Sequence, residues 1–211
     1  MGTERSNEGV IAALRAGLPV LLPTDTVYGL CAAAAQEEAA LAVYRLKGRS
    51  ETQPSALLAA SVESLYKALP DLRGETGLAV RVLLPGPYTL VLPNPMRRYR
   101  WLSGTRTDAI GVRVPVLPEA AREAVEAVGA VLATSANEPG EPSPVALTDV
   151  PARIRSACAA ELDAGPLPGT PSTVIDFTGR EPYVIREGAA SAREAIERVR
   201  AARREDGRVS N

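Results

Sequence analysis

The sequence predicts an α/β fold with an open, twisted sheet of mixed parallel and antiparallel strands and flanking helices. Three observations support this prediction. Short apolar runs alternate along the chain with amphipathic stretches of helical period. Two strand-like runs, 172–177 and 182–187, flank the short turn 178–180, which predicts a hairpin and therefore an antiparallel pair. Apolar residues make up 45% of the chain and charged residues 23%, as in an ordinary globular domain.

Helices are expected where polar caps and glycine stops enclose amphipathic stretches. The first is capped by Ser6 or Asn7 and stops at Gly17, and the second has acidic residues at its start, basic residues at its end and a stop at Gly48. The predicted helices are 7–17, 36–48, 61–69, 74–84, 117–129 and 191–205. The strands that precede the hairpin are expected at 18–24, 55–60, 88–93, 109–115 and 130–137. No internal repeat is found, so we expect one domain over residues 1–211.

Charge and composition exclude several classes of protein. The net charge is −1, so binding to nucleic acid or to a membrane would need a local patch. No apolar run reaches the length of a membrane span and the N-terminus is polar, so we expect a cytoplasmic protein with no membrane partner. The chain has no histidine, which excludes Ser-His-Asp and Cys-His catalysis. Cys31 and Cys158 cannot form a structural zinc site by themselves.

The basic residues are almost all arginine. Of the 24 lysines and arginines only Lys47 and Lys67 are lysines. A compact ammonium can do what a planar guanidinium cannot, so a lysine in this background is informative. Lys47 and Arg49 lie two residues apart at the end of a predicted helix. They are either cations that favour the helix C-terminus or ligands for phosphate.

Small polar and cationic residues gather where the predicted strands end, and ligands of open α/β sheets bind at such places. No phosphate-binding glycine loop of the known types is present. The candidates are Thr24, Asp25 and Thr26, then Lys47 and Arg49, Arg113, Ser135, Asn137 and Ser143, Ser172 and Thr173, and Arg186. Each also has a structural explanation, such as helix capping at Thr24, an exposed strand position at Arg113 or an Asx turn at Asn137.

Taken in order, these stretches strongly resemble the YrdC family of threonylcarbamoyl-AMP synthases. The stretches that carry the resemblance are PTDTVYGL (23–30), KGR (47–49), PGPYTLVLP (85–93), GVRVP (111–115), TSAN (134–137) with PSP (142–144), PSTVID (171–176) and IREG (185–188). The match runs from about residue 10 to about residue 190 and is similar to the short, single-domain form of the family. The C-terminal helix at about 191–205 would follow it.

The resemblance implies a fold and a reaction. The fold is a mixed α/β sheet around a concave, positively charged cavity. The enzyme joins L-threonine, bicarbonate and ATP to give threonylcarbamoyl-AMP and pyrophosphate. Other proteins of the pathway then transfer the threonylcarbamoyl group to tRNA. ATP is a substrate, Mg²⁺ is expected on its phosphates, and no metal site on the protein is expected.

The resemblance also implies roles for most of these candidates, with catalysis by positioning and charge neutralisation. Lys47 and Arg49 would be catalytic and would bind the ATP phosphates. The remaining assignments are Ser135, Asn137, Ser143 and Arg186 for the nucleotide, and Arg113, Ser172 and either Thr24 or Thr26 for threonine. Several relatives have a threonine-contacting histidine at a place that falls near Leu58, whereas other relatives have an apolar residue there.

Two further questions are open at this point. The stretch RRYRWLSGTR (97–106) combines four arginines with two aromatic residues, which suits direct contact with double-stranded RNA or tRNA. The alternative is a solvated loop that is anchored by a half-buried Trp101. The alternatives to the synthase are a carbamoyl-adenylate-forming relative and an RNA- or nucleotide-binding module without turnover.

Overall fold

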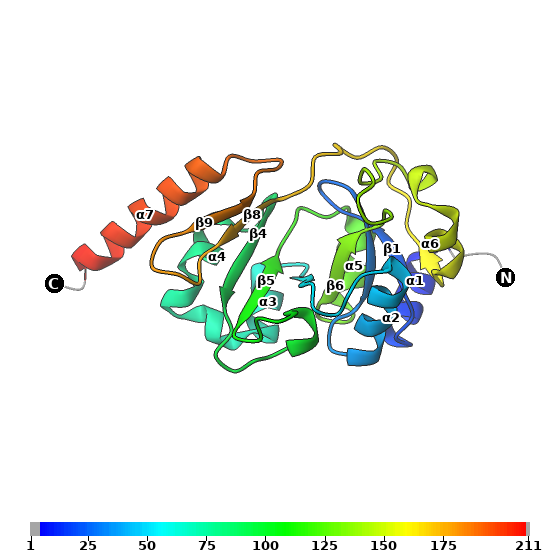
Figure 1. The fold of residues 1–211 in the computed structure, drawn as a ribbon, viewed down its shortest axis with the longest axis horizontal. Helices are drawn as coiled ribbons and strands as arrows, with labels where there is room; N and C mark the ends of the chain where they lie inside the picture. Colours follow the sequence, from blue (N-terminus) through cyan, green and yellow to red (C-terminus); the bar gives the residue numbers. More distant parts are fainter. Residues whose placement is uncertain (1–4, 210–211) are drawn as a thin grey trace.

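The strands form one mixed sheet in residues 5–209, the part of the chain that the structure describes (Figure 1). This computed structural model contains β1 (Val20–Pro23), β2 (Tyr28–Ala33), β3 (Ala56–Leu58), β4 (Tyr88–Pro93), β5 (Ala109–Arg113), β6 (Val131–Ser135), β7 (Ala160–Glu161), β8 (Thr173–Asp176) and β9 (Tyr183–Arg186). Within the described residues the order across the sheet is β7-β1-β2-β6-β3-β5-β4-β8-β9. The β1–β7, β3–β5 and β4–β8 pairs are parallel, and the other neighbours are antiparallel. The predicted mixed sheet is therefore confirmed.

Helices flank this sheet on both sides. They are α1 (Asn7–Arg15), α2 (Glu37–Lys47), α3 (Val62–Ala68), α4 (Leu78–Leu83), α5 (Glu119–Glu126), α6 (Ala152–Ala157) and α7 (Ala192–Val209). The Ser6 hydroxyl accepts a hydrogen bond from the backbone N–H of Gly9 at 2.9 Å and caps α1, and Gly48 ends α2 in the left-handed region with φ 67°. α7 continues past the end predicted at about residue 205. No helix of the described residues is long and apolar enough to cross a membrane.

Four segments differ from the sequence prediction. β2 was not predicted, because it is buried along its whole length and its small apolar residues show no alternation. α6 and β7 were missed as well, since both are short. The helix predicted over 74–84 is α-helical only from Leu78 onward, and a 3₁₀ turn precedes it at Glu75–Gly77.

The sheet has a different set of helices on each face. α1 and α5 pack on one face, where Leu14 and Val125 join Leu22, Leu58 and Val131 in one apolar cluster. α2, α3, α4, α6 and α7 contribute to a larger cluster on the opposite face. α1 and α7 lie at opposite ends of the molecule, and the segment 162–172 runs between the two ends along one side of it (Figure 1). Because only two helices cover the first face, part of that face is open.

Candidate active site

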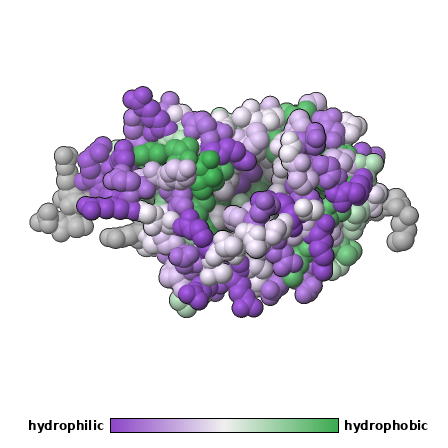
Figure 2. Space-filling model, in the orientation of Figure 1, coloured by the Kyte–Doolittle hydropathy of each residue, from purple (hydrophilic) through white to green (hydrophobic). Residues whose placement is uncertain are grey.

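A cavity of about 590 Å³ opens on the sheet face that α1 and α5 share. Its floor is made of small residues from four strands, Gly29, Ala56, Gly111 and Ala133. The alternation of side chains along a strand puts these residues on the same face as Leu58, which α1 and α5 cover. In Figure 2 the surface is hollowed near the middle of the view, with apolar surface beside the hollow. The small floor residues allow a ligand to approach the sheet backbone closely.

The structure brings the residues that the resemblance assigns to ATP and threonine to this one cavity, although they come from distant parts of the chain. The lining includes Thr24, Thr26, Lys47, Arg49, Arg113, Ser135, Asn137, Ser143, Ser172 and Arg186. Two other candidates do not line it. Asp25 lies behind the lining and pairs with Arg113, and the Thr173 hydroxyl donates to the backbone oxygen of Ala190.

Among the described residues, every charged side chain that lines the cavity is a cation. They are Lys47, Arg49, Arg106, Arg113 and Arg186. This confirms the predicted positive cavity. Arg106 was not predicted as a site residue, although it is the last arginine of the stretch 97–106. It donates to Asp176 Oδ2 at 2.7 Å and to Thr178 Oγ1 at 2.8 Å.

Lys47 is 4% exposed and lies at the C-terminus of α2, a favourable place for a cation. Its ammonium donates to the Ser135 backbone oxygen and to Asn137 Oδ1, both at 2.6 Å, and also to the Asn137 backbone oxygen. Burial, with a smaller effect from Arg49, lowers the pKa of Lys47 to about 8. The three oxygen acceptors favour the charged form and act in the opposite direction.

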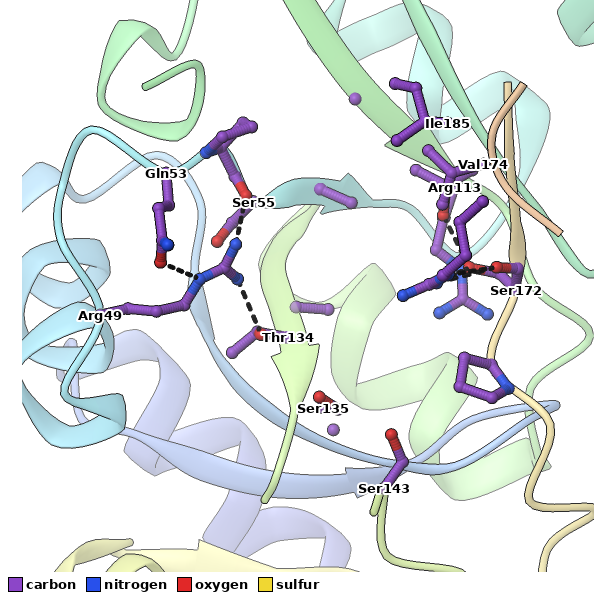
Figure 3. Close-up of a pocket in the computed structure, with 18 of the residues that line it drawn as sticks. Arg49, Gln53, Ser55, Arg113, Thr134, Ser135, Ser143, Ser172, Val174 and Ile185 are labelled. Atoms are coloured by element: carbon purple, nitrogen blue, oxygen red, sulfur yellow. Dashed lines mark hydrogen bonds between the residues drawn. The ribbon is translucent and has the colours of Figure 1, made fainter. Parts of the chain in front are cut away.

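Arg49 faces the cavity with neutral partners (Figure 3). Its Nε donates to Gln53 Oε1 at 3.0 Å, and its two terminal nitrogens donate to Thr134 Oγ1 at 3.2 Å and to the Pro54 backbone oxygen at 3.0 Å. Thr134 also lines the cavity, and sequence reasoning missed it, although it belongs to the TSAN stretch. These bonds fix the guanidinium without neutralising its charge.

Arg113 is largely rather than fully buried, and its side chain keeps 11% of its exposure. The explanation of Arg113 as an exposed strand residue is therefore wrong. Its Nη2 donates to Asp25 Oδ1 at 2.7 Å and to Thr26 Oγ1 at 3.3 Å. Burial lowers the pKa of Arg113, although the charge of Asp25 acts in the opposite direction. Burial also raises the pKa of Asp25, and this outweighs the lowering by Arg113.

The hydroxyls of Thr24 and Thr26 have different hydrogen-bonding capacity. Thr24 Oγ1 donates its one proton to the Val27 backbone oxygen at 2.7 Å. It also accepts from the backbone N–H groups of Thr26 and Val27, both at 3.2 Å. Thr26 Oγ1 lies 3.1 Å from Thr24 Oγ1, so Thr26 supplies the proton of that contact. Thr24 is therefore occupied by the turn between β1 and β2. Thr26 Oγ1 also accepts from Arg113 Nη2 at 3.3 Å and keeps one lone pair, which can accept a hydrogen bond from a ligand amine.

Ser172 lies on the opposite wall, at the start of β8. Its hydroxyl is 2.9 Å from Thr89 Oγ1, and its backbone oxygen accepts from Arg186 Nη2 at 2.8 Å. Thr89 lines the cavity and was missed, although it lies in the quoted stretch 85–93. Val174 pairs with Arg186 but Ile175 pairs with Val184, so Ile185 is an extra residue in β9. This bulge lets Ile185 and Arg186 both reach the cavity.

Two regions outside the lining also bear on the sequence analysis. Leu58 is 1% exposed and packs in the α1/α5 cluster, so it does not line the cavity beside Arg113. Trp101 is half-buried, and its indole N–H donates to the Ala34 backbone oxygen at 3.0 Å. The Tyr99 ring packs edge-on against Trp101 with centroids 6.0 Å apart. The anchor predicted at a half-buried Trp101 is therefore confirmed.

The described residues contain no group of three or more His, Cys, Asp or Glu side chains that could hold a metal ion. The cations, hydroxyls and amide of the cavity suit anions instead. The fold and the site thus define an open α/β protein whose basic cavity, on one face of the sheet, suits phosphate- and carboxylate-bearing ligands.

Comparison with known proteins gives the family. The model of the Sua5/YciO/YrdC family, described as telomere recombination, matches residues 12–188, so this chain belongs to that family. A protein of Mycobacterium tuberculosis H37Rv is 33% identical over 201 residues, which cover 92% of this chain and 90% of that protein. The threonylcarbamoyl-AMP synthase of Pyrococcus abyssi is 34% identical over 187 residues, which cover 88% of this chain and 54% of that enzyme.

Solved structures agree with this assignment. The crystal structure of P. abyssi Sua5 complexed with L-threonine superposes with a TM-score of 0.78 and 34% identity. The superposition covers 92% of this chain and 58% of that one, so this chain spans little more than half of the Pyrococcus protein. Escherichia coli YciO has a TM-score of 0.74 at 24% identity, which shows the same fold.

Proposed function

We propose that this chain is a threonylcarbamoyl-AMP synthase, which makes threonylcarbamoyl-AMP and pyrophosphate from L-threonine, bicarbonate and ATP. The observation that carries the proposal is the joint presence of two anion subsites in one cavity. One subsite has Arg113 with hydroxyls beside it, and the other has Lys47 and Arg49. The Pyrococcus relative that bears this name, and its structure with L-threonine, support the choice of substrates.

The threonine subsite lies at the Arg113 wall. Arg113 would bind the amino-acid carboxylate, because a guanidinium suits a carboxylate and Asp25 fixes its orientation. Thr26 rather than Thr24 would contact the amino acid, since the Thr24 hydroxyl is already occupied by the turn. Ser172 lies on the facing wall and would orient the same ligand.

The ATP subsite lies on the Lys47 side and along the loop that follows β6. Arg49 presents an uncompensated positive charge to the phosphates. Lys47, at the C-terminus of α2, adds its charge from beside residues 135–137. The other proposed nucleotide ligands are Ser135, Asn137, Ser143 and Arg186.

The reaction needs positioning more than a strong base. The neutral threonine amine attacks the carbon of carbon dioxide and releases a proton to solvent, or attacks bicarbonate and releases water, and either route forms a carbamate. A carbamate oxygen then attacks the α-phosphate in line, and pyrophosphate leaves with the bond electrons. Cations around the phosphates stabilise the charge that develops on the leaving group. Mg²⁺ would enter on the ATP phosphates as part of the substrate, since no described carboxylate cluster fits it.

The product is a mixed anhydride, so a second protein must transfer the threonylcarbamoyl group to tRNA. We expect that step in the cytoplasm, together with the proteins of the modification pathway. Direct contact with double-stranded RNA or tRNA would use the exposed arginines Arg97, Arg98 and Arg100.

Pyrophosphate release from ATP, Mg²⁺ and bicarbonate, with and without L-threonine, tests the proposal. Release that depends on both threonine and bicarbonate is the expected result, with serine as the comparison amino acid. Release with another amine acceptor would instead indicate a carbamoyl-adenylate-forming relative. ATP binding without any release would indicate a nucleotide-binding module.

A further inference from the structure

Lys47 is one of only two lysines in a chain that otherwise uses arginine for its cations. The other, Lys67, is exposed on α3. Lys47 is 4% exposed and its ammonium is surrounded by protein oxygens. The chemical question is why this position carries an ammonium rather than a guanidinium.

The bonds of Lys47 give an answer. An ammonium has three N–H donors on one atom. In Lys47 these meet three oxygens, the backbone oxygens of Ser135 and Asn137 and the side-chain Oδ1 of Asn137. No donor of the ammonium is left over for a phosphate. A planar guanidinium spreads its donors over a wide fork and cannot converge on three oxygens around one point.

The same oxygens belong to a loop that Asn137 organises. Asn137 Oδ1 accepts a second bond from Ser135 Oγ at 2.5 Å, and Asn137 Nδ2 donates to the Glu141 backbone oxygen. Two further contacts support the loop: the Ala136 N–H donates to the Tyr28 backbone oxygen at 3.0 Å, and Arg153 forms a bidentate ion pair with Glu138 at 2.7 and 3.0 Å. Lys47 differs from both, because a single atom binds the backbone at Ser135 and at Asn137 together with the Asn137 side chain.

We propose that Lys47 is a positioning residue: its ammonium fixes the loop 135–141 in the ligand-free protein and is not a direct ligand of the ATP phosphates. The loop then presents Ser135 and Ser143 to the nucleotide, while Arg49 meets the phosphates directly. The effect on ATP rests on the proposed function. The effect on the loop does not, because it concerns the protein without ligand.

Hydrogen exchange of the ligand-free protein, followed by mass spectrometry, tests the inference. The variants are Lys47→Met and Lys47→Arg, with Lys67→Met as the matched control at the other lysine. Amides of residues 136–143 should exchange at least about tenfold faster in both Lys47 variants, because each loses the three converging bonds. Amides of β4 and β5 should keep the wild-type rate, as should all amides of Lys67→Met.

Wild-type exchange of 136–143 in Lys47→Met or in Lys47→Arg would overturn the proposal. If Lys47→Met does not fold, Asn137→Ala replaces it, since it removes the side-chain acceptor and should also speed exchange of the loop.

Steady-state kinetics give the second readout. Lys47→Arg should raise the KM for ATP about tenfold and leave the KM for threonine unchanged, because a guanidinium cannot make the three converging bonds that fix the loop. A wild-type KM for ATP in Lys47→Arg would contradict the proposal. Absence of turnover in the wild type would refute the proposed function but leave the exchange result intact.

Discussion

The cations of the cavity are of two kinds. The first kind has only neutral oxygen partners among the described residues: Lys47, Arg49 and Arg186. The second kind forms an ion pair with a carboxylate: Arg113 with Asp25, and Arg106 with Asp176. All of them line the same cavity, so the difference lies in their partners rather than in their location.

This difference suits two different ligands. A cation with neutral partners keeps its full charge, which a polyphosphate needs. A cation paired with a carboxylate brings little net charge but a fixed direction, which suits the carboxylate of a zwitterionic amino acid. The cations proposed to contact ATP directly, Arg49 and Arg186, are both of the first kind, and Arg113, proposed for threonine, is of the second kind. The predictions below test whether the two kinds separate the two substrates.

The largest effect is expected for Arg113→Met. This change removes the proposed carboxylate ligand and leaves Asp25 buried without its cation, which is costly. We expect kcat/KM for threonine to fall by at least about a hundredfold and the melting temperature to fall as well. The rate of pyrophosphate release at a series of threonine concentrations gives kcat/KM. Thermal unfolding gives the melting temperature. Wild-type kcat/KM for threonine would remove Arg113 from the amino-acid subsite.

Arg49→Met should affect the other substrate. It removes an uncompensated charge that faces the cavity but leaves no carboxylate unpaired, so stability should change little. We expect kcat/KM for ATP to fall about thirtyfold, the size of one or two charged hydrogen bonds. Threonine binding without ATP, measured by calorimetry, should keep the wild-type Kd. A change in the Kd for threonine as large as the change for ATP would show that the two kinds of cation do not separate the substrates.

Asp25→Asn tests the carboxylate itself. Asparagine keeps an oxygen near Arg113 but not the charge, so the guanidinium loses its fixed orientation. The KM for threonine should rise about tenfold, whereas the KM for ATP should stay within about twofold. Asp25→Glu should recover part of the loss. Glu181→Ala is the control. It removes an exposed carboxylate that does not line the cavity and that forms an ion pair with Arg200 of length 2.6 Å. Equal rises in both KM values would contradict an orienting role.

The pH dependence of ATP binding should follow Lys47. Burial and Arg49 lower its pKa to about 8, so the ammonium and one loop bond are lost above that pH. The KM for ATP should rise severalfold between about pH 7.5 and 9. In the unfolded chain the lysine keeps its proton to about pH 10.4. The unfolded state thus binds more protons in this window, and the contribution of this group to stability rises with pH. A wild-type profile as flat as that of Lys47→Arg would contradict the prediction.

The smallest effect separates Thr26 from Thr24. Thr26→Ala should raise the KM for threonine about fivefold, the size of one neutral hydrogen bond, and should lower the melting temperature less than Thr24→Ala does, because its hydroxyl makes fewer bonds within the protein. Thr24→Ala should instead lower the melting temperature by several degrees, because it removes three bonds of the turn between β1 and β2. The reverse pattern would place Thr24 in the subsite.

Much of the fold was predictable because its elements carry local signals. Helix caps such as Ser6 and stops such as Gly48 fix the boundaries of α1 and α2 within a few residues. β2 could not be predicted, because a strand that is buried on both faces loses the alternation that marks a strand. α6 and β7 are too short for a periodic pattern.

The candidate site was predictable in its residues and not in its contacts. The sequence motifs between residues 23 and 188 include all the polar residues that the resemblance assigns to the substrates, and all of these residues line the cavity. They did not show that Thr89, Thr134 and Arg106 join the lining. These residues reach it through strand pairing and loop packing across more than 40 residues of sequence, for example Thr89 to Ser172 at 2.9 Å with a separation of 83.

By itself the sequence determined the fold class, the absence of histidine chemistry and the set of polar residues at the strand ends, because these depend on residue type and local spacing. Only the tertiary structure decided which charges remain available. Arg113 is paired because β5 brings it to Asp25 in the turn after β1, and Lys47 is saturated because α2 ends below the loop 135–141. The available charge of a side chain depends on its neighbours in space and on its burial, and neither is a local property of the chain.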